Sequence, residues 1–309
     1  MKFQTDGFIT LSGASTLRYK LIMLALLPGS VSAGSARDYL SAPIDSWLAF
    51  YNMGYSRSVT PEDALGITPS VRTNVVSQSV VITRTLDYWG RTGGFSLVLP
   101  HHYLNANADN FSKSNQGFGD TGILWQINLF GAPALNREQF RSFIPETFSS
   151  FHLFVGTPVG KYDAESAMNP GANRWTFSPT INYSYTPDSG WTWLETYLKT
   201  NLFTDNNDYR VNYANRLSQK PLWIIEGHAS RNVTPELWLS ADAYYNIGGE
   251  TRIDGVGQDN AANTLRLGGG FGLRTWIGGD IIVNYERVVA KPGGQPEAQA
   301  IRLTLRQFW

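Results

Sequence analysis

One stretch near the carboxyl end decides the fold: Ile301-Arg302-Leu303-Thr304-Leu305-Arg306, in which apolar and polar side chains alternate. Successive side chains of a β-strand point to opposite faces of its sheet. The stretch therefore predicts a strand with one apolar face and one polar, cationic face. A protein built from such strands keeps an apolar medium on one side of its sheet and polar groups on the other.

The same alternation continues upstream through most of the chain. Leu265, Leu267, Phe271 and Leu273, for example, alternate with arginine and glycine. We count about twelve candidate strands, near residues 45–57, 70–87, 93–104, 117–130, 147–158, 173–186, 191–204, 220–232, 236–248, 263–276, 280–290 and 297–308. An even number is what a single-chain bacterial barrel requires, because its two ends return to the same side.

The connections between these strands sort by length. Short turns lie at 187–190, 233–235 and 277–279, and longer polar stretches at 104–116, 159–172, 205–219 and 249–262. Short periplasmic turns that alternate with long external loops are typical of outer-membrane barrels. The sequence therefore predicts an all-β fold, a transmembrane antiparallel up-and-down β-barrel of about twelve strands.

The composition agrees with a chain whose surface meets lipid. The 309 residues include 25 basic and 25 acidic side chains, so the formal net charge is zero and no attraction to nucleic acid is expected. Charged residues make up 16% and aromatic residues 13%, with 10 Trp and 15 Tyr. Such amphipathic rings suit a bilayer interface, although a soluble aromatic-rich β protein remains the alternative. The absence of cysteine excludes disulfides, thiolate metal sites and a cysteine nucleophile.

The first 33 residues read as a secretory signal peptide. Arg18 and Lys20 precede the apolar run 21–27, which Pro28-Gly29 closes before a small-residue cleavage site. We expect cleavage after Ala33, with Ala36 as the second choice, and a barrel domain over 34–309. After residue 33 no apolar stretch approaches the roughly 20 residues that a membrane helix needs, which excludes a helical inner-membrane protein.

Polar side chains on the alternate positions are expected to face a wet lumen. The charged set expected there to govern selectivity comprises Glu195, Lys199, Glu226, His228, Asp242, Arg266, Arg274, Glu286, Arg302 and Arg306. The aromatic set expected to line the path comprises Trp193, Tyr197, Trp238 and Tyr244. Alternatively, these side chains pair with each other and close the lumen. The segment 34–45 is expected to be too short to plug the barrel, and loop 205–219 is the better candidate for a constriction.

Histidines are the side chains that titrate near neutral pH, so an acid–base or metal site would draw on them. His101 and His102 are adjacent and point to opposite faces, whereas His152 and His228 both face the expected lumen. Ser150 lies on the same face as His152, which leaves an outer-membrane hydrolase as an alternative. Glycine-rich stretches lack the context of a phosphate loop, and the acidic loops lack EF-hand spacing. We expect no cofactor, no metal and no catalytic residue.

Several short stretches, in order along the chain, resemble the family of meta-pathway phenol degradation proteins. They are 117–120 (Gly-Phe-Gly-Asp), 157–163 (Thr-Pro-Val-Gly-Lys-Tyr-Asp), 171–175 (Gly-Ala-Asn-Arg-Trp), 204–209 (Thr-Asp-Asn-Asn-Asp-Tyr) and 248–252 (Gly-Gly-Glu-Thr-Arg). The resemblance implies a transporter-like outer-membrane barrel and a link to aromatic or hydrocarbon catabolism. It supplies no catalytic residue. The terminal Phe308-Trp309 resembles the recognition signal of outer-membrane assembly substrates, although Gln307 departs from the apolar residue usual at its position.

The resulting expectation is a porin-like channel in the Gram-negative outer membrane, not an enzyme. It would take up small organic molecules passively, with aromatic solutes favoured only through the family resemblance. Its partners would be membrane lipid and lipopolysaccharide, the outer-membrane assembly machinery and the solute, with no nucleic acid. The alternatives are a hydrolase that uses a lumen or wall histidine and a sealed, purely structural barrel.

Overall fold

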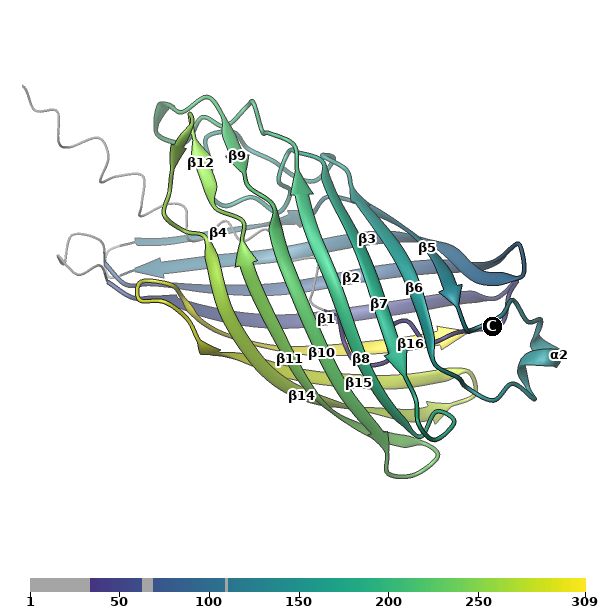
Figure 1. The fold of residues 1–309 in the computed structure, drawn as a ribbon. Coiled ribbons are helices and arrows are strands. Elements are labelled where there is room, and N and C mark those ends of the chain that lie inside the picture. The colour runs from purple at the N-terminus through teal and green to yellow at the C-terminus, as the bar shows by residue number, and fades with distance from the viewer. Residues whose placement is uncertain (1–33, 63–68, 109–110) are drawn as a thin grey trace, which may run out of the picture.

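Twelve strand positions close into one antiparallel barrel in the computed structural model, which describes residues 34–62, 69–108 and 111–309 (Figure 1). The predicted signal peptide, 1–33, lies outside these residues. The wall consists of β1 (Trp47–Thr60), β2 (Val71–Tyr88), β3 (Arg91–Ala108), β4 (Phe111–Phe118), β5 (Gly122–Phe130), β6 (Phe148–Gly156), β7 (Thr176–Tyr185), β8 (Thr192–Phe203), β10 (Leu222–Asn232), β11 (Leu237–Gly248), β14 (Ala262–Trp276), β15 (Gly279–Ala290) and β16 (Glu297–Phe308). The predicted fold class is confirmed.

The barrel closes where the first strand meets the last. β1 pairs with β16 from Leu48 opposite Phe308 to Val59 opposite Glu297, and β1 also pairs with β2. Trp47 and Trp309 each donate a backbone hydrogen bond of 3.0 Å to the other. Closure of this kind satisfies backbone groups that an open sheet edge would leave exposed in lipid.

One strand position is occupied by two consecutive strands. β4 pairs with residues 101–108 of β3, and β5 pairs with residues 93–98 of the same strand. Residues 119–121 separate β4 from β5. The sequence predicted a loop over 104–116, which is wrong because strands occupy most of that range. Residues 112–116 are all polar, so they show no apolar alternation even though they form a strand.

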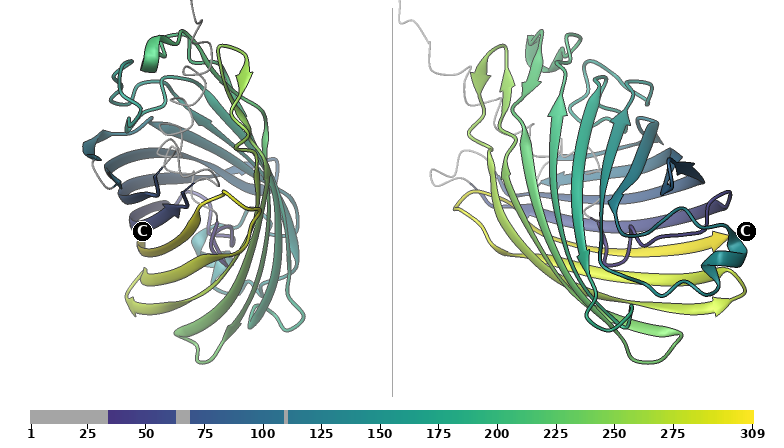
Figure 2. Two further views of the ribbon diagram at one scale, coloured as in Figure 1. Left: turned by 90° about the vertical axis from the view of Figure 1, so that its left-hand side faces the viewer. Right: turned by 45° about the vertical axis from the view of Figure 1, so that its right-hand side comes forward.

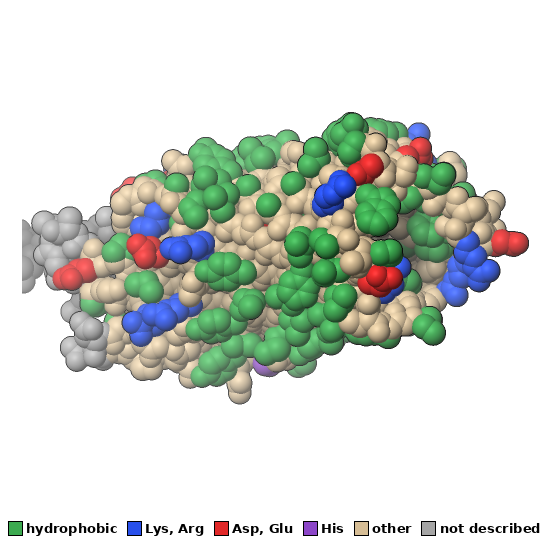
Figure 3. All heavy atoms as spheres, turned by 90° about the horizontal axis from the view of Figure 1, so that it is seen from below, with side chains coloured by type: hydrophobic (Ala, Val, Ile, Leu, Met, Phe, Trp, Pro, Cys, Tyr) green, Lys and Arg blue, Asp and Glu red, His purple; other side chains and the backbone are tan. Residues whose placement is uncertain are grey.

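Apolar side chains cover the outside of the wall. On β8, Leu194, Leu198 and Leu202 are 40–47% exposed, whereas the alternate residues Glu195 and Lys199 are buried. In Figure 3 charged side chains gather toward the two ends of the visible face, and apolar side chains cover the band between them. The distribution is the inverse of a water-soluble protein, and it confirms the predicted orientation of the two strand faces. Among the described residues, no helix has the length and apolarity to cross a membrane.

The two ends of the barrel differ. The carboxyl terminus, the short turns and α2 (Arg137–Phe140) lie at one end of the barrel. The long loops lie at the other, where β9 (Leu217–Gln219), β12 (Thr251–Ile253) and β13 (Val256–Gly257) form a small separate sheet. It packs with η2 (Val211–Tyr213) around Tyr209, Val211 and Ile253. Figure 2 shows these loops from two further sides. Loop 205–219 is therefore folded on its own core at the long-loop end.

Candidate functional site

The lumen holds a cavity of about 1340 Å³. Its lining begins among the long loops, at Pro61 and Pro292, and reaches Leu48, Thr85 and Thr92 near the short-turn end. These last three residues lie within four positions of a strand end. In the half nearer the long loops, strands all round the barrel line the cavity, including β7, β8, β10 and β11. Toward the short turns its lining comes mainly from β1–β3, and this side of the barrel borders the cavity along nearly its whole length.

Residues 34–45, here termed the N-terminal plug, enter the lumen on the side of β8, β10 and β11, and the end of this segment crosses to Thr85 of β2 at the short-turn end. Ala36 packs between Trp238 and Ile282, and Leu40 packs beside Phe148 and Trp193. The segment was expected to be too short to plug the barrel, and it does fill part of the lumen while the cavity stays open beside it. A twelve-strand lumen lined on one side by large side chains is narrow enough for a dozen residues to fill part of its width.

Arg37 anchors the plug to the wall. Its guanidinium donates hydrogen bonds to Ser230 Oγ at 2.9 Å, to Asn232 Oδ1 at 2.6 Å and to the Trp191 carbonyl at 3.3 Å. It also lies 5.0 Å from the centre of the Trp238 ring. The backbone of Arg37 has a φ of 68°, a left-handed conformation that costs about 1–3 kcal/mol for a residue other than glycine. The guanidinium contacts offset that strain.

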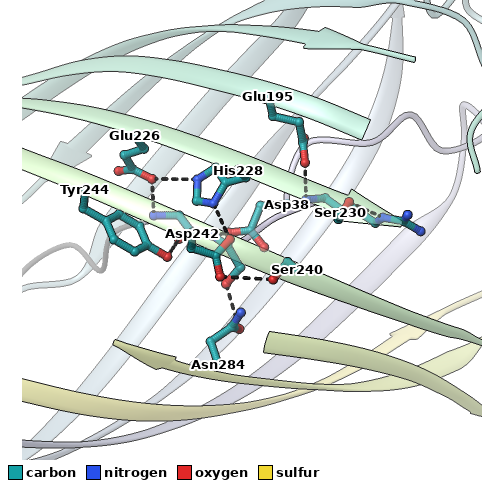
Figure 4. Close-up of polar contacts among 12 residues, drawn as sticks. Asp38, Glu195, Glu226, His228, Ser230, Ser240, Asp242, Tyr244 and Asn284 are labelled. Carbon is teal, nitrogen blue, oxygen red and sulfur yellow. Dashed lines mark hydrogen bonds and ion pairs between the residues drawn. The ribbon is translucent and has the colours of Figure 1, made fainter. Parts of the chain in front are cut away.

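Four carboxylates gather around the plug at mid-depth: Asp38, Glu195, Glu226 and Asp242 (Figure 4). Glu195 accepts a hydrogen bond from the Arg37 backbone N–H at 2.8 Å and another from the Tyr197 hydroxyl at 2.8 Å. His228 lies between two of the four, with Nδ1 2.7 Å from Asp242 Oδ1 and Nε2 3.4 Å from Glu226 Oε2.

Cations surround this anionic group. The Arg302 guanidinium donates to Ser35 Oγ at 3.3 Å, and the Lys199 ammonium interacts electrostatically with Glu226. Buried charges are tolerated only when they are paired and hydrogen-bonded, which this arrangement achieves by mixing both signs around the plug. The set acts as a polar core inside the barrel.

The structure brings most of the predicted charged set together. Glu195, Lys199, Glu226, His228 and Asp242 are all under 8% exposed and surround the plug. Arg266, Glu286 and Arg306 line the cavity, and each is paired: Arg266 with Glu286 at 2.6 Å, and Arg306 with Asp280, a partner that sequence reasoning missed. Arg302 also lines the cavity. Arg274 is exposed near the short-turn end of β14, apart from the rest. The selectivity role of these residues stays a prediction.

The predicted aromatic lining packs against the plug. Trp193, Tyr197, Trp238 and Tyr244 are at most 7% exposed, and of the four only Tyr244 borders the cavity. Tyr39 of the plug lies with its ring centre 5.0 Å from that of Tyr197 and 3.8 Å from that of His152. In the docked state, most of this aromatic set therefore fills the lumen beside the plug.

Ser150 and His152 have part of the geometry of a nucleophile and its base. Ser150 Oγ lies 2.7 Å from His152 Nε2, and both side chains are at most 2% exposed. Asn182 contacts Ser150, however, and His152 Nδ1 has no hydrogen-bond partner among the described residues. A working base needs a third group to orient its ring. Tyr39 also covers this ring, so the pair reads as lumen packing.

The open wall is lined by small hydroxyl groups that sequence reasoning missed. Thr73, Ser77, Ser79, Thr83 and Thr85 follow one face of β2 at alternate positions, and all five line the cavity. Thr83 Oγ1 bonds Ser96 Oγ at 2.7 Å across the β2–β3 pair. The period-two spacing of Ser and Thr over 73–85 was the signal that could have revealed this track.

An ion pair lies at the mouth of the cavity among the long loops. Lys220 Nζ is 2.7 Å from Glu250 Oε2, and Glu250 lines the cavity. The hydrogen bond from Lys220 lowers the pKa of the Glu250 carboxyl below its ordinary value. The pair links the loop before β10 to the loop after β11.

Known proteins place this barrel in a family. Residues 50–300 match the family model described as "Putative MetA-pathway of phenol degradation". The COG4313 outer membrane channel from Pseudomonas putida F1 superposes with a TM-score of 0.74 at 18% identity, over 90% of this chain and 100% of that chain. The translocator domain of the autotransporter NalP from Neisseria meningitidis gives 0.51 at 10% identity, over 87% and 90% respectively.

A second autotransporter shares the fold at a similar level. The β domain of the Bordetella autotransporter BrkA gives a TM-score of 0.53 at 10% identity, over 84% of this chain and 98% of that chain. No curated protein sequence matches this chain. At these identities the solved structures establish the shared fold of an outer-membrane β-barrel.

Proposed function

This chain belongs to the family described as "Putative MetA-pathway of phenol degradation", and we propose that it is a passive channel of the Gram-negative outer membrane for small organic molecules. The family match covers 50–300, which is nearly all of the barrel. The COG4313 protein from Pseudomonas putida F1, which shares the fold over 90% of this chain, is itself an outer membrane channel. Both observations favour transport over the alternatives of catalysis and a sealed barrel.

The observation that carries this proposal is the cavity along β1–β3. It runs from the long loops to the last residues before the short turns, beside the plug residues that pack on β8, β10 and β11. A sealed structural barrel would have packed this side of the lumen as it packs the other. The small side chains at Ser77, Ser79 and Thr83 leave the space open.

The chemistry of the cavity wall favours solutes with both apolar and polar parts. Hydroxyl groups of Ser77, Ser79 and Ser96 alternate in space with the aliphatic side chains of Val75 and Val98. An aromatic ring with a hydroxyl substituent could pack on the aliphatic groups and exchange hydrogen bonds with the hydroxyls. Each such contact is weak, and conduction requires sites that solutes can leave as well as enter.

Two adjacent residues of β2 provide the test. Ser79 lines the cavity, whereas its neighbour Val80 is 41% exposed on the lipid side. Reconstituted in a planar bilayer, the wild type is expected to give discrete conductance steps. Ser79→Trp should lower the conductance several-fold because the indole occupies the cavity, and Val80→Trp should leave it unchanged.

Two results would contradict the proposal. Absence of conductance in the wild type would favour a sealed barrel, and equal conductance of Ser79→Trp and Val80→Trp would remove the β1–β3 path. Solute class is tested separately, by the rate at which cells with each variant deplete phenol or toluene from dilute medium. An ester or lipid hydrolysis assay on the same preparations tests the hydrolase alternative.

A further inference from the structure

We propose that the lumen contains a binding site for an α-ammonium group, that of Gly34 itself, which cleavage after Ala33 would create. Glu226 is the anionic partner in this site. The bond locks the N-terminal plug in place and can reach full strength only in the processed protein. The proposal rests on the predicted cleavage site and on contacts of the described residues, and it goes beyond the proposed transport function.

The geometry around Gly34 is that of a binding site for a nitrogen. The Gly34 nitrogen donates to Glu226 Oε2 at 2.7 Å, and the Tyr244 hydroxyl donates to the Gly34 carbonyl at 3.1 Å. The next backbone nitrogen, that of Ser35, donates to Asp38 Oδ2 at 2.6 Å. Figure 4 shows Glu226, Tyr244 and Asp38 converging on the lumen from β10, β11 and the plug.

Space at this position admits only glycine without rearrangement. A Cβ on residue 34 would lie 2.8 Å from Glu226 Oε2 and 3.0 Å from Tyr197 Cε2. Both neighbours are themselves at most 2% exposed, so they have little room to move. The residue whose backbone nitrogen binds Glu226 is thus also the one that the cleavage rule places first in the mature chain. These two observations are independent, since one concerns packing and the other concerns the pattern of residues 18–33.

Electrostatics explain why a charged nitrogen fits better than an amide. The site contains the buried carboxylates Glu226 and Asp242, with Asp38 of the plug beside them and Glu195 beyond. An α-amino group is largely protonated near neutral pH, so cleavage adds one positive charge 2.7 Å from the Glu226 oxygen. Hydrogen bonds between charged partners are roughly twice as strong as neutral ones. Before cleavage the same nitrogen is a neutral amide and offers Glu226 a single proton.

The lock would couple plug docking to export. A chain that still carries its leader forms the weaker amide contact, whereas a processed chain gains the ion pair. The plug then adopts its docked position in the mature barrel, held at Gly34 by Glu226 and at Arg37 by Ser230 and Asn232.

The test measures how well the folded barrel protects its own α-amine. The full-length gene, leader included, is expressed in a Gram-negative host, and the protein is purified from its membranes. Mass spectrometry of the amino-terminal peptide is expected to find Gly34 first. Acetylation of that amine by an N-hydroxysuccinimide ester near neutral pH should be at least tenfold slower in the folded wild type than in the same protein denatured. Glu226→Gln should lose most of that protection.

The controls separate this site from general folding. Glu250→Gln alters a carboxylate at the mouth of the cavity, away from Gly34, and should keep the wild-type protection. Heat-modifiable mobility in gels shows whether each variant forms a barrel. If Glu226→Gln does not fold, Gly34→Ala leaves the carboxylate in place and should still expose the amine.

Three results would overturn the proposal: a mature chain that begins at another residue, equal acetylation of folded and denatured wild type, or a folded Glu226→Gln protein that stays protected. None of these measurements involves conductance. Failure here is therefore distinguishable from failure of the channel proposal.

Discussion

Two walls of one barrel face each other across the lumen, and they have been built in opposite ways. β8, β10 and β11 carry Glu195, Glu226, His228 and Asp242 inward and hold the plug against them. β1, β2 and β3 carry many small hydroxyl and aliphatic side chains inward, and the cavity of about 1340 Å³ borders these three strands along nearly their whole length. In Figure 1 the first group forms the near wall and the second the far wall. One wall anchors a plug, and the other leaves a path beside it.

The largest expected effect comes from freeing the plug at Arg37. Arg37→Ala removes three guanidinium hydrogen bonds, and bonds of charged groups contribute about 1.5–3 kcal/mol each. Because such contributions are not additive, we expect the docked plug to lose roughly 3 kcal/mol. Single-channel conductance should rise several-fold, and the plug should become accessible to protease in reconstituted barrels.

Arg231→Ala serves as the matched control. Its side chain is 69% exposed at the short-turn end, where it pairs with Asp188. Both conductance and protease resistance should stay at wild-type values. Unchanged conductance in Arg37→Ala as well would show that the plug does not limit passage.

The outer surface should not distinguish the two walls at all. Leu198 on β8 and Leu97 on β3 are 43% and 44% exposed and both point outward. An arginine that faces lipid near the middle of the bilayer costs about 2–4 kcal/mol. Leu198→Arg and Leu97→Arg should therefore lower the free energy of unfolding by similar amounts. Urea titrations of barrels in lipid vesicles, followed by tryptophan fluorescence, measure both. A large cost for one variant only would mean that lipid covers one wall and not the other.

Two lumen glycines sharpen the contrast between the crowded and the open wall. A Cβ on Gly272 of β14 would lie 2.3 Å from the Trp238 ring, which itself contacts Arg37. A Cβ on Gly54 of β1 would lie 3.8 Å from the nearest atom. Overpacking costs about 1–3 kcal/mol, so Gly272→Ala should destabilise the barrel by that amount and Gly54→Ala should not. Equal effects in urea titrations would refute the difference in packing.

Sequence periodicity was enough to predict the walls. Alternation in stretches such as 265–273 gave the strand positions and the outward face, because lipid selects apolar residues at every second position. It also placed Glu226 and His228 in the lumen. Periodicity could not predict the plug, whose contacts join residues far apart in the chain, such as Arg37 and Asn232. Periodicity also missed β4, because a strand that is polar on both faces carries no alternating signal.

The smallest effect is expected at the mouth of the cavity, where the strands of both walls end in the long loops. The hydrogen bond from Lys220 lowers the pKa of Glu250, so the ionised carboxylate is favoured in the folded protein. A group with a lowered folded pKa contributes stability above its unfolded pKa and loses it as the pH falls through the folded value. The Lys220–Glu250 contact should therefore persist at neutral pH and disappear only in acid, below the ordinary range of a glutamate.

Lys220→Met should move the Glu250 titration midpoint, followed by carboxyl NMR shifts, upward toward that range. Because Lys220 is 52% exposed, solvent screens the pair and unfolding at neutral pH should hardly change. A midpoint that does not move in Lys220→Met would mean that this ion pair does not hold the two loops together at the cavity mouth.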